Sequence, residues 1–342
     1  MTTLVTGAAG FVGRQVVEAL RERGQPVRAM VRQDRQAAEL KEQGVEAIVG
    51  DVRRSQDVWN AMRGVTIVQH CAALVGHGRG PGHSRQEVYD VNLGGVRTVL
   101  EALRDAGTGK MILLSSINVL GTRNIERATE DLPTRREGEP HADVKIDAEE
   151  LAAEFHREHG VDVTVLRPGL IYGPGERNLP KLLDAIRRGK FKFIGGRDNI
   201  VPMLHVRDMV AAMLAAAESD ASAGKTYHIT DGTRTTMGEL ADFLAEAAGV
   251  EKPRKAFPYI VPRVACSVFG ALAKLGLRKK PAPINKVSLR FLGTSRFVDI
   301  SRARDELGYH PTVDFREGMA ETVRWIESQT HDESNVADAA AR

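Results

Sequence analysis

The chain has 342 residues, enough for one large α/β domain or two closely joined ones, and its 42% hydrophobic content supports a proper core. Its 48 basic and 45 acidic residues leave a net charge of +3, which excludes a general attraction to nucleic acid. Two cysteines in apolar runs, Cys71 and Cys266, indicate no disulfide framework, and with no signal peptide at the first residues a cytoplasmic protein is expected.

The first predicted strand, residues 2–6, leads into a glycine-rich turn and then into a helix predicted for 12–23. Glycine lets the backbone approach a phosphate group, and a helix N-terminus offers unpaired N–H groups and a positive dipole end. Gly7 would form the tight turn, Gly10 would approach a pyrophosphate, and Gly13 would let the helix pack on the strand. This strand–turn–helix context predicts dinucleotide binding.

Strands and helices alternate through the first half of the sequence. Such alternation predicts right-handed βαβ units and a doubly wound parallel sheet, the Rossmann fold, with helices on both faces. The strands are predicted at 2–6, 26–31, 45–49, 66–70, 110–116 and 161–166, and the helices at 12–23, 35–43, 55–62, 84–106 and 142–159.

The second strand is followed by Arg32, with Arg35 on the next turn, and no acid stands at the strand end. An acid at this point binds the ribose 2′-hydroxyl of NAD, whereas an arginine accommodates the 2′-phosphate of NADP. NADP(H) is therefore the preferred cofactor. Asp34 could still bind a ribose, which keeps NAD(H) open, and two solvated surface arginines are the plainer interpretation.

An acid, Asp51, ends the third strand and is followed by Val52. A carboxylate at the carboxyl end of this strand could accept a hydrogen bond from the adenine amino group. Capping the next helix is a competing use of Asp51, and both uses are compatible.

Small residues, Ala72 and Ala73, follow the fourth strand, where they would let a cofactor lie across the sheet edge. The next loop holds His77 and His83, whose spacing lacks further nearby ligands, so no metal site is predicted. We expect this loop to be mobile and to line the substrate cleft.

Together these motifs resemble the extended short-chain dehydrogenase/reductase superfamily, the NAD-dependent epimerase/dehydratase superfamily. The resemblance covers residues 1 to about 328 and is specific for the superfamily, but says little about the substrate. It rests on the stretches 6–13, 72–73, 91–92, 115–116, 167–175, 204–208 and 227–229 and on Asp51. It implies cofactor contacts at Gly7, Gly10, Phe11, Val12, Gly13, Arg32, Arg35, Asp51, Val52, Ala72, Ala73, Asn92, Ser115, Lys145, Pro168, Gly169 and Ile171.

In that superfamily a serine, a tyrosine and a lysine carry the proton chemistry, with the lysine four residues after the tyrosine on one helix face. Here Ser116 matches the serine and Lys145 the lysine, but His141 stands at the tyrosine position. The resemblance implies that Lys145 binds the nicotinamide ribose and that Ser116 hydrogen-bonds the substrate oxygen.

The replacement by His141 leaves three interpretations open. A histidine, with a reference pKa of about 6.5, can exchange a proton near neutral pH, but an adjacent Lys145 disfavours its charged form. His141 could donate the proton with the help of a water or of Asp143. Alternatively, the proton comes from substrate or water while His141 shapes the pocket, or the site is catalytically silent.

The second half is predicted to form a substrate-binding lobe, 176–328, interleaved with a dinucleotide-binding domain over 1–175 and followed by a disordered tail, 329–342. Its helices are predicted at 178–188, 206–218, 237–248 and 315–327, with an alternating strand at 190–194.

The apolar stretch 259–277 and the segment 282–311 resemble the 3β-hydroxysteroid dehydrogenase branch, which acts on bulky apolar alcohols and ketones. The preferred prediction is an NAD(P)-dependent oxidoreductase acting at a carbonyl, a hydroxyl or a conjugated carbonyl of a polycyclic or long-chain substrate. A sugar-nucleotide epimerase or dehydratase is the alternative, because Arg290 and Arg296 could meet a diphosphate. A non-catalytic dinucleotide-binding protein is the third, favoured by His141.

Two further contacts are expected. Residues 259–280 form either a buried core helix or a helix that lines an apolar pocket or rests on a membrane surface, and basic residues follow at 278–280. By analogy with the fold family, helices 84–106 and 142–159 are expected to form a homodimer interface.

Overall fold

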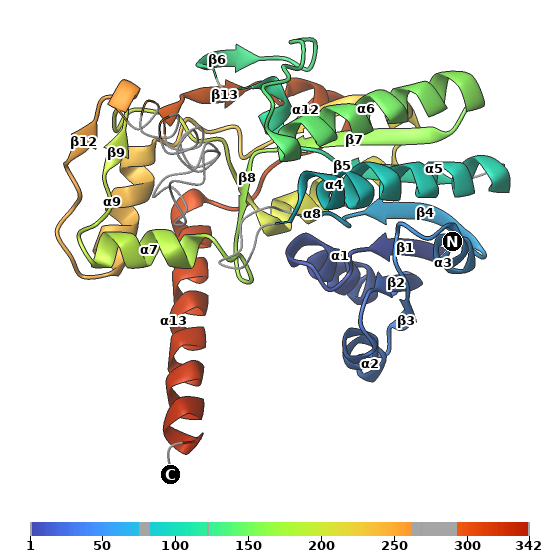
Figure 1. Ribbon diagram of the computed structural model, residues 1–342, viewed down its shortest axis with the longest axis horizontal. Coiled ribbons are helices and arrows are strands. Elements are labelled where there is room, and N and C mark those ends of the chain that lie inside the picture. The colour runs from blue at the N-terminus through green and yellow to red at the C-terminus, as the bar shows by residue number, and fades with distance from the viewer. Residues whose placement is uncertain are drawn as a thin grey trace.

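A computed structural model of the chain (Figure 1) describes residues 2–74, 83–107, 109–121, 123–261, 264, 268 and 293–340, with 330–340 described as backbone alone. Its centre is a parallel sheet of seven strands in the order β11-β7-β5-β4-β1-β2-β3, which confirms the predicted doubly wound fold. The strands are β1 (Thr2–Thr6), β2 (Val27–Val31), β3 (Glu46–Val49), β4 (Val65–His70), β5 (Lys110–Leu114), β7 (Asp162–Pro168) and β11 (Thr226–Ile229).

Helices cover both faces of this sheet (Figure 1) because both faces of its strands are apolar. One buried cluster packs against α1 (Phe11–Glu22), α2 (Asp34–Glu42), α8 (Val206–Glu218) and α12 (Ser301–Leu307). The other packs against α3 (Ser55–Ala61), α5 (Gly95–Ala106) and α6 (Pro140–His159). In α1 the buried residues Val12, Val16, Val17 and Leu20 follow the helical period and form its sheet-facing stripe.

The strand order reverses between β1 and β4. From β1 the chain proceeds outward to β2 and β3, and it then crosses back to place β4 on the other side of β1. In open α/β sheets a ligand binds outside the carboxyl ends of the strands at such a switch point. The residues that follow β1 and β4 therefore flank the expected binding crevice.

The helix predicted at 84–106 is interrupted, which corrects that prediction. It consists of α4 (Arg85–Tyr89), a π-helical turn η1 (Asp90–Gly94) and α5. The turn contains Asn92, whose side-chain amide bonds both backbone groups of Leu74, accepting from its N–H at 2.7 Å and donating to its carbonyl at 3.1 Å. A local widening of this kind is frequent at functional sites.

The smaller lobe has its own buried cluster. Its elements are α7 (Leu179–Arg187), α9 (Met237–Ala247), α13 (Phe315–Ala340) and two short parallel pairs, β8 (Leu170–Tyr172) with β10 (Met203–His205) and β9 (Phe193–Ile194) with β12 (Ala256–Phe257). The strand predicted at 190–194 is thus shorter than expected. A third pair joins β6 (Ile125–Ala128) to β13 (Arg296–Val298), and the short helices are η2 (Ile117–Leu120) and η3 (Asp220–Ser222).

The tail predicted to be disordered is helical as far as Ala340, because α13 continues through it and projects from the body of the molecule (Figure 1). The prediction gave weight to the missing apolar stripe, whereas alanine, which is frequent in the tail, is the best helix former. Among the described residues, no helix combines the length and the apolar character needed to cross a bilayer.

Candidate functional site

The glycine-rich turn between β1 and α1 lies against the segment that follows β4. Gly7 adopts a φ of +65°, and a Cβ there would lie 2.7 Å from the Cα atom of Ala72. A Cβ on Gly13 would lie 2.3 Å from the carbonyl oxygen of Gly7. Both positions therefore require glycine, and the turn and the Ala72 segment meet at the switch point.

The amino end of α1 fits an anionic group such as a pyrophosphate. Gly10 is the N-cap residue, makes no side-chain capping bond, and no acidic residue occupies the first turn. The first N–H groups of α1 therefore keep their hydrogen-bonding capacity and the positive dipole end faces no carboxylate of its own helix. Gly175 closes on this end, since a Cβ there would lie 3.2 Å from the ring of Phe11.

At the predicted adenine end, Asp51 pairs with Arg53, whose guanidinium donates to the carboxylate at 2.5 Å. This bond, with a contribution from Arg32, lowers the pKa of Asp51. Helix α3 has Arg54 as its N-cap, so the alternative use of Asp51 as the cap is wrong. Arg35 is exposed and pairs with Glu39 at 2.9 Å.

Behind the crevice, β1 and β4 are joined by Thr6, whose hydroxyl lies 3.1 Å from Nδ1 of His70 and accepts from the N–H of Ala72 at 3.3 Å. Burial lowers the pKa of His70 to about 3, so the imidazole is neutral. The sequence analysis did not include Thr6 or His70 as individual site residues. The available signal was that each is the last residue of a predicted strand, 2–6 or 66–70, and the structure pairs the two residues in register.

Lys145 lies at the carboxyl ends of the central strands. It projects from α6, is only 6% exposed, and its ammonium donates to the carbonyl oxygen of Leu114 at 2.5 Å. Burial lowers the pKa of Lys145 to about 8, against opposing effects of Glu149 and Cys71. The same burial raises the pKa of the Cys71 thiol to about 12, so this cysteine is not a nucleophile.

Ser116 follows β5 by two residues and caps η2, where its hydroxyl oxygen accepts from the N–H of Asn118 at 3.1 Å. Because the hydroxyl accepts in this bond, its hydrogen can be donated to a substrate oxygen. Ser116 and the Leu114 carbonyl that holds Lys145 belong to the same short segment, so the structure brings these two predicted residues together.

His141 is the second residue of α6, after Pro140, and is partly buried with its Nδ1 atom shielded from solvent. Its spacing of four residues from Lys145 places both on one helix face. The Asp143 carboxylate, considered above as a helper, accepts from the backbone N–H of Glu137 at 3.0 Å and is buried. It therefore fixes the preceding loop.

An ion pair that the sequence analysis missed adjoins these residues. The Glu149 carboxylate accepts from Arg167 at 2.7 Å and from the hydroxyl of Ser115. The available signals were the spacing of four residues between Lys145 and Glu149 and a lone arginine directly after the strand predicted at 161–166. Ser115 thus directs its hydroxyl to Glu149, and its cofactor contact stays a prediction.

The remaining predicted cofactor residues lie on the same edge of the sheet. Pro168 ends β7 and Ile171 lies in β8. Gly169 has a packing reason of its own, since a Cβ there would lie 2.2 Å from the carbonyl oxygen of Pro202. Val52, after β3, is buried, and Ala73 follows Ala72 beside the glycine turn.

Several predictions fall on segments outside the described residues. They concern His77, Cys266, Arg290 and most of 259–280. Within the last segment Ile260, Val261, Val264 and Val268 are described and exposed, and the membrane contact stays a prediction. In the described part of the chain, no group of three or more His, Cys, Asp or Glu side chains could hold a metal. Arg296 is buried and donates to the side chain of Asn118 at 2.8 Å.

Comparison with known proteins gives consistent similarities. The family described as "NAD dependent epimerase/dehydratase family" matches residues 3–230. "Sterol demethylase protein B" of Methylococcus capsulatus is 34% identical, over 95% of this chain and 98% of that protein. "Sterol-4-alpha-carboxylate 3-dehydrogenase, decarboxylating" of Mus musculus is 30% identical, over 94% of this chain and 89% of that protein. The crystal structure of a Thermus thermophilus UDP-glucose 4-epimerase complex with NAD superimposes with a TM-score of 0.73 at 25% identity, over 96% of this chain and 99% of that chain.

Proposed function

This chain belongs to the NAD dependent epimerase/dehydratase family and is an oxidoreductase, and on that premise we propose that it transfers hydride between a nicotinamide dinucleotide and a carbonyl or hydroxyl carbon of a bulky apolar substrate. The observation that carries the proposal is the buried ammonium of Lys145 beside Ser116, at the edge where the glycine turn meets Ala72.

The residues have distinct roles in this proposal. The amino end of α1 binds the pyrophosphate, and Lys145 binds the hydroxyls of the nicotinamide ribose. Ser116 donates a hydrogen bond to the substrate oxygen and orients it. The cofactor, when bound, supplies or accepts the hydride.

For the proton we propose His141, which exchanges it with the substrate oxygen directly or through one water. The family position that it occupies and its place one helical turn before Lys145 support this role. The alternative in which substrate or water supplies the proton is distinguished by the His141 variants discussed below.

An apolar substrate is supported by the relatives. The two relatives from Methylococcus capsulatus and Mus musculus act, by their names, on sterols. A Stigmatella aurantiaca ketoreductase of a farnesyl quinoline, 30% identical over 93% of this chain and 95% of that protein, extends the pattern. We propose NADP(H) as the cofactor because Arg32 is close enough to Asp51 to lower the pKa of that carboxyl, and so lies near the predicted adenosine end.

A sugar-nucleotide substrate is the second candidate, supported by the superposition on the epimerase. It is weakened by Arg296, one of the two arginines that could meet a diphosphate, because this side chain is buried and bonded to Asn118.

The test is a turnover assay that follows the reduced nicotinamide at 340 nm. The wild-type enzyme receives NADP or NAD with a 3β-hydroxysteroid, or NADPH or NADH with a 2-alkyl-3-oxoalkanoate, and Lys145→Met serves as the inactive control. UDP-glucose is supplied with NAD or NADP, and its epimer is measured by chromatography because epimerisation leaves no net reduced nicotinamide. We expect nucleotide-dependent turnover of an apolar substrate that the control lacks. Turnover of UDP-glucose alone would favour the second candidate, and binding without turnover would favour a non-catalytic protein.

A further inference from the structure

The buried carboxylate of Glu149 joins three elements that converge on the site. It lies one helical turn after Lys145 on α6, and its Oε1 atom accepts from the hydroxyl of Ser115. The guanidinium of Arg167 donates to it from the end of β7, with Nε at 3.0 Å and Nη2 at 2.7 Å. One carboxylate therefore ties α6 to the residues that follow β5 and to β7.

Both charged partners are withdrawn from solvent. The side chains of Arg167 and Glu149 are 8% and 9% exposed. A buried ion pair loses about as much in desolvation as it gains in attraction, so stability alone is a weak reason for its presence. A better reason for this pair is a role in positioning neighbouring side chains or in stabilising the charge that one of them carries.

The neighbours of the pair are the proposed catalytic residues. Ser115, which Glu149 binds, directly precedes Ser116. Glu149 also acts on Lys145, whose pKa it raises against the effect of burial. Loss of the Glu149 charge would leave the Lys145 ammonium with the backbone carbonyl of Leu114 as its bonded partner.

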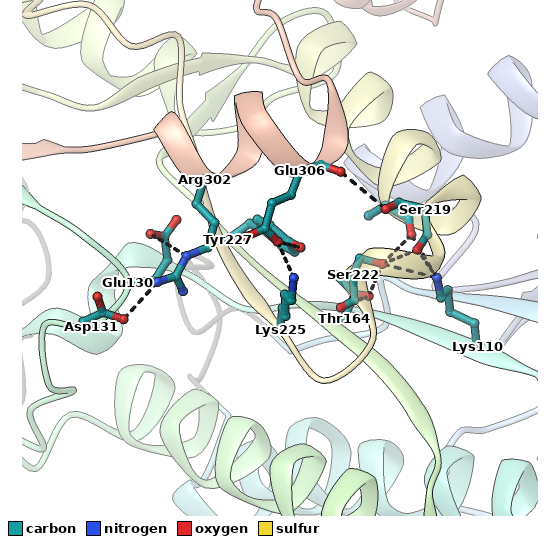
Figure 2. A network of polar contacts seen from close by, with 11 residues as sticks. Lys110, Glu130, Asp131, Thr164, Ser219, Ser222, Lys225, Tyr227, Arg302 and Glu306 are labelled. Atoms are coloured by element: carbon teal, nitrogen blue, oxygen red, sulfur yellow. Dashed lines mark hydrogen bonds and ion pairs between the residues drawn. The ribbon is translucent and has the colours of Figure 1, made fainter.

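Arg167 is itself held from its far side. Its Nη1 atom donates to the carbonyl oxygen of Glu130 at 3.5 Å. The Glu130 carboxylate accepts from the N–H of His228 on β11 at 2.8 Å and lies 3.7 Å from Arg302 of α12. Figure 2 shows Arg302 directed at both Glu130 and Asp131, and its Nη2 atom lies 2.9 Å from Oδ1 of Asp131. The segment around Glu130 thus fixes the orientation of Arg167.

We propose that Glu149 and Arg167 are positioning residues, which set the place of Ser116 through Ser115 and keep the Lys145 ammonium charged for the nicotinamide ribose. This inference rests on the proposed function, because it assigns the roles of Ser116 and Lys145 from it. Glu149 acts through these residues and contacts neither cofactor nor substrate.

The test compares Glu149→Gln, which keeps the shape but removes the charge, with Glu149→Asp, which keeps the charge but shortens the side chain. Dissociation constants for the preferred reduced nucleotide are measured by fluorescence from pH 6 to 10. In the wild type we expect binding to weaken as Lys145 loses its proton. In Glu149→Gln the pH at which binding begins to weaken should fall by about one unit. In Glu149→Asp this pH should stay as in the wild type, but turnover should be lost.

A second readout needs no cofactor. Since the pKa of Lys145 is lowered in the folded chain, the contribution of Lys145 to stability rises with pH between about 8 and 10.5, and in Glu149→Gln this rise should begin at a lower pH. The difference between the stability profiles of the two chains isolates this contribution. The control is Asp184→Asn, which removes an exposed ion pair with Arg188 on α7 and should shift neither profile.

The outcomes separate the two hypotheses. A wild-type chain that binds neither pyridine nucleotide contradicts the proposed function. A wild-type chain that binds, together with a Glu149→Gln variant whose two pH profiles coincide with those of the wild type, contradicts the positioning role alone. If Glu149→Gln does not fold, wild-type turnover in Glu149→Asp likewise contradicts it.

Discussion

The ammonium nitrogen of Lys145 lies 2.5 Å from the carbonyl oxygen of Leu114, so a cation carried by α6 is fixed on the last residue of β5. Ser116 follows that residue by two positions, and Lys145 is almost completely buried. The site therefore holds a charge that costs folding stability, because burial lowers the pKa of Lys145 to about 8. Such a cost is expected where function requires the charge.

Replacement of this lysine by methionine should stabilise the chain while abolishing turnover. The folded-state pKa lies below the unfolded value of 10.5, so the ammonium disfavours folding at pH 7 and this cost disappears as pH rises from 8 to 10.5. Lys145→Met should therefore be about 1–3 kcal/mol more stable than wild type at pH 7. Urea unfolding at pH 7 and pH 9.5 measures this, and an advantage that does not shrink at the higher pH would contradict it.

Asp231 should be a second destabilising charge. Burial raises the pKa of Asp231 to about 6, and its Oδ2 atom is buried with no hydrogen-bond partner in the described part of the chain. A raised carboxyl pKa favours the folded state at low pH, and this contribution is lost as pH rises through 6. Asp231→Asn should stabilise by about 1–2 kcal/mol at pH 7.5 and by little at pH 4. Thermal melts at both values test this, and equal effects at both would count against it.

Cofactor preference should depend on Arg32. Arg32 directly follows β2 and adds a minor contribution to the lowered pKa of Asp51, which is due mainly to Arg53, whereas Arg35 is exposed and paired with Glu39. Arg32→Ala should weaken NADPH binding by about tenfold or more and leave NADH binding nearly unchanged, because a charge-assisted bond to phosphate contributes about 1.5–3 kcal/mol. Arg35→Ala is the matched comparison and should have the smaller effect. Titration of both nucleotides decides, and equal losses for NADH and NADPH would be evidence against a 2′-phosphate site.

Two variants of His141 test its proton transfer. His141→Phe keeps a planar ring without a titratable atom and should lower kcat by about 10²–10⁴. His141→Tyr introduces the phenol of the wider superfamily and should raise the reduction of ordinary ketones. The measurement is kcat against pH for all three enzymes. A phenylalanine variant as fast as wild type at every pH would remove His141 from the mechanism.

Much of this fold could be predicted from local patterns. The βαβ alternation defined the first six strands of the sheet, because each is a short run rich in apolar residues and bounded by turn residues, and all but the edge strand β3 are largely buried. The seventh strand, β11, was not predicted as a strand, since it enters the sheet from the second half of the chain over only four residues. The π-turn at Asp90–Gly94 was also missed, and its Asn92 bonds Leu74, a tertiary contact that no local pattern indicates.

The site was predictable only in part, because several of its contacts join residues that are distant in the sequence. Gly7, Gly13 and Lys145 belong to spaced motifs, and each lies where its spacing requires. The pairing of Glu149 with Arg167 joins positions 18 residues apart on different elements, which no periodicity reveals. Arg53 was missed as the partner of Asp51 because exposed arginines are common.

The most direct test of the account is a fluorescence titration of NADPH and NADH into the wild-type chain and into Gly10→Asp. Gly10 has a φ of −77° and is the N-cap of α1, so an aspartate there could itself cap the helix, and its Cβ would lie 3.0 Å from the carbonyl oxygen of Gly7. We predict saturable binding to the wild type, and a loss of at least about tenfold in Gly10→Asp, because the carboxylate would repel the pyrophosphate. A cooperative thermal melt of the variant shows that it is folded. Failure of the wild type to bind either nucleotide, or equal binding by the variant, would contradict the account.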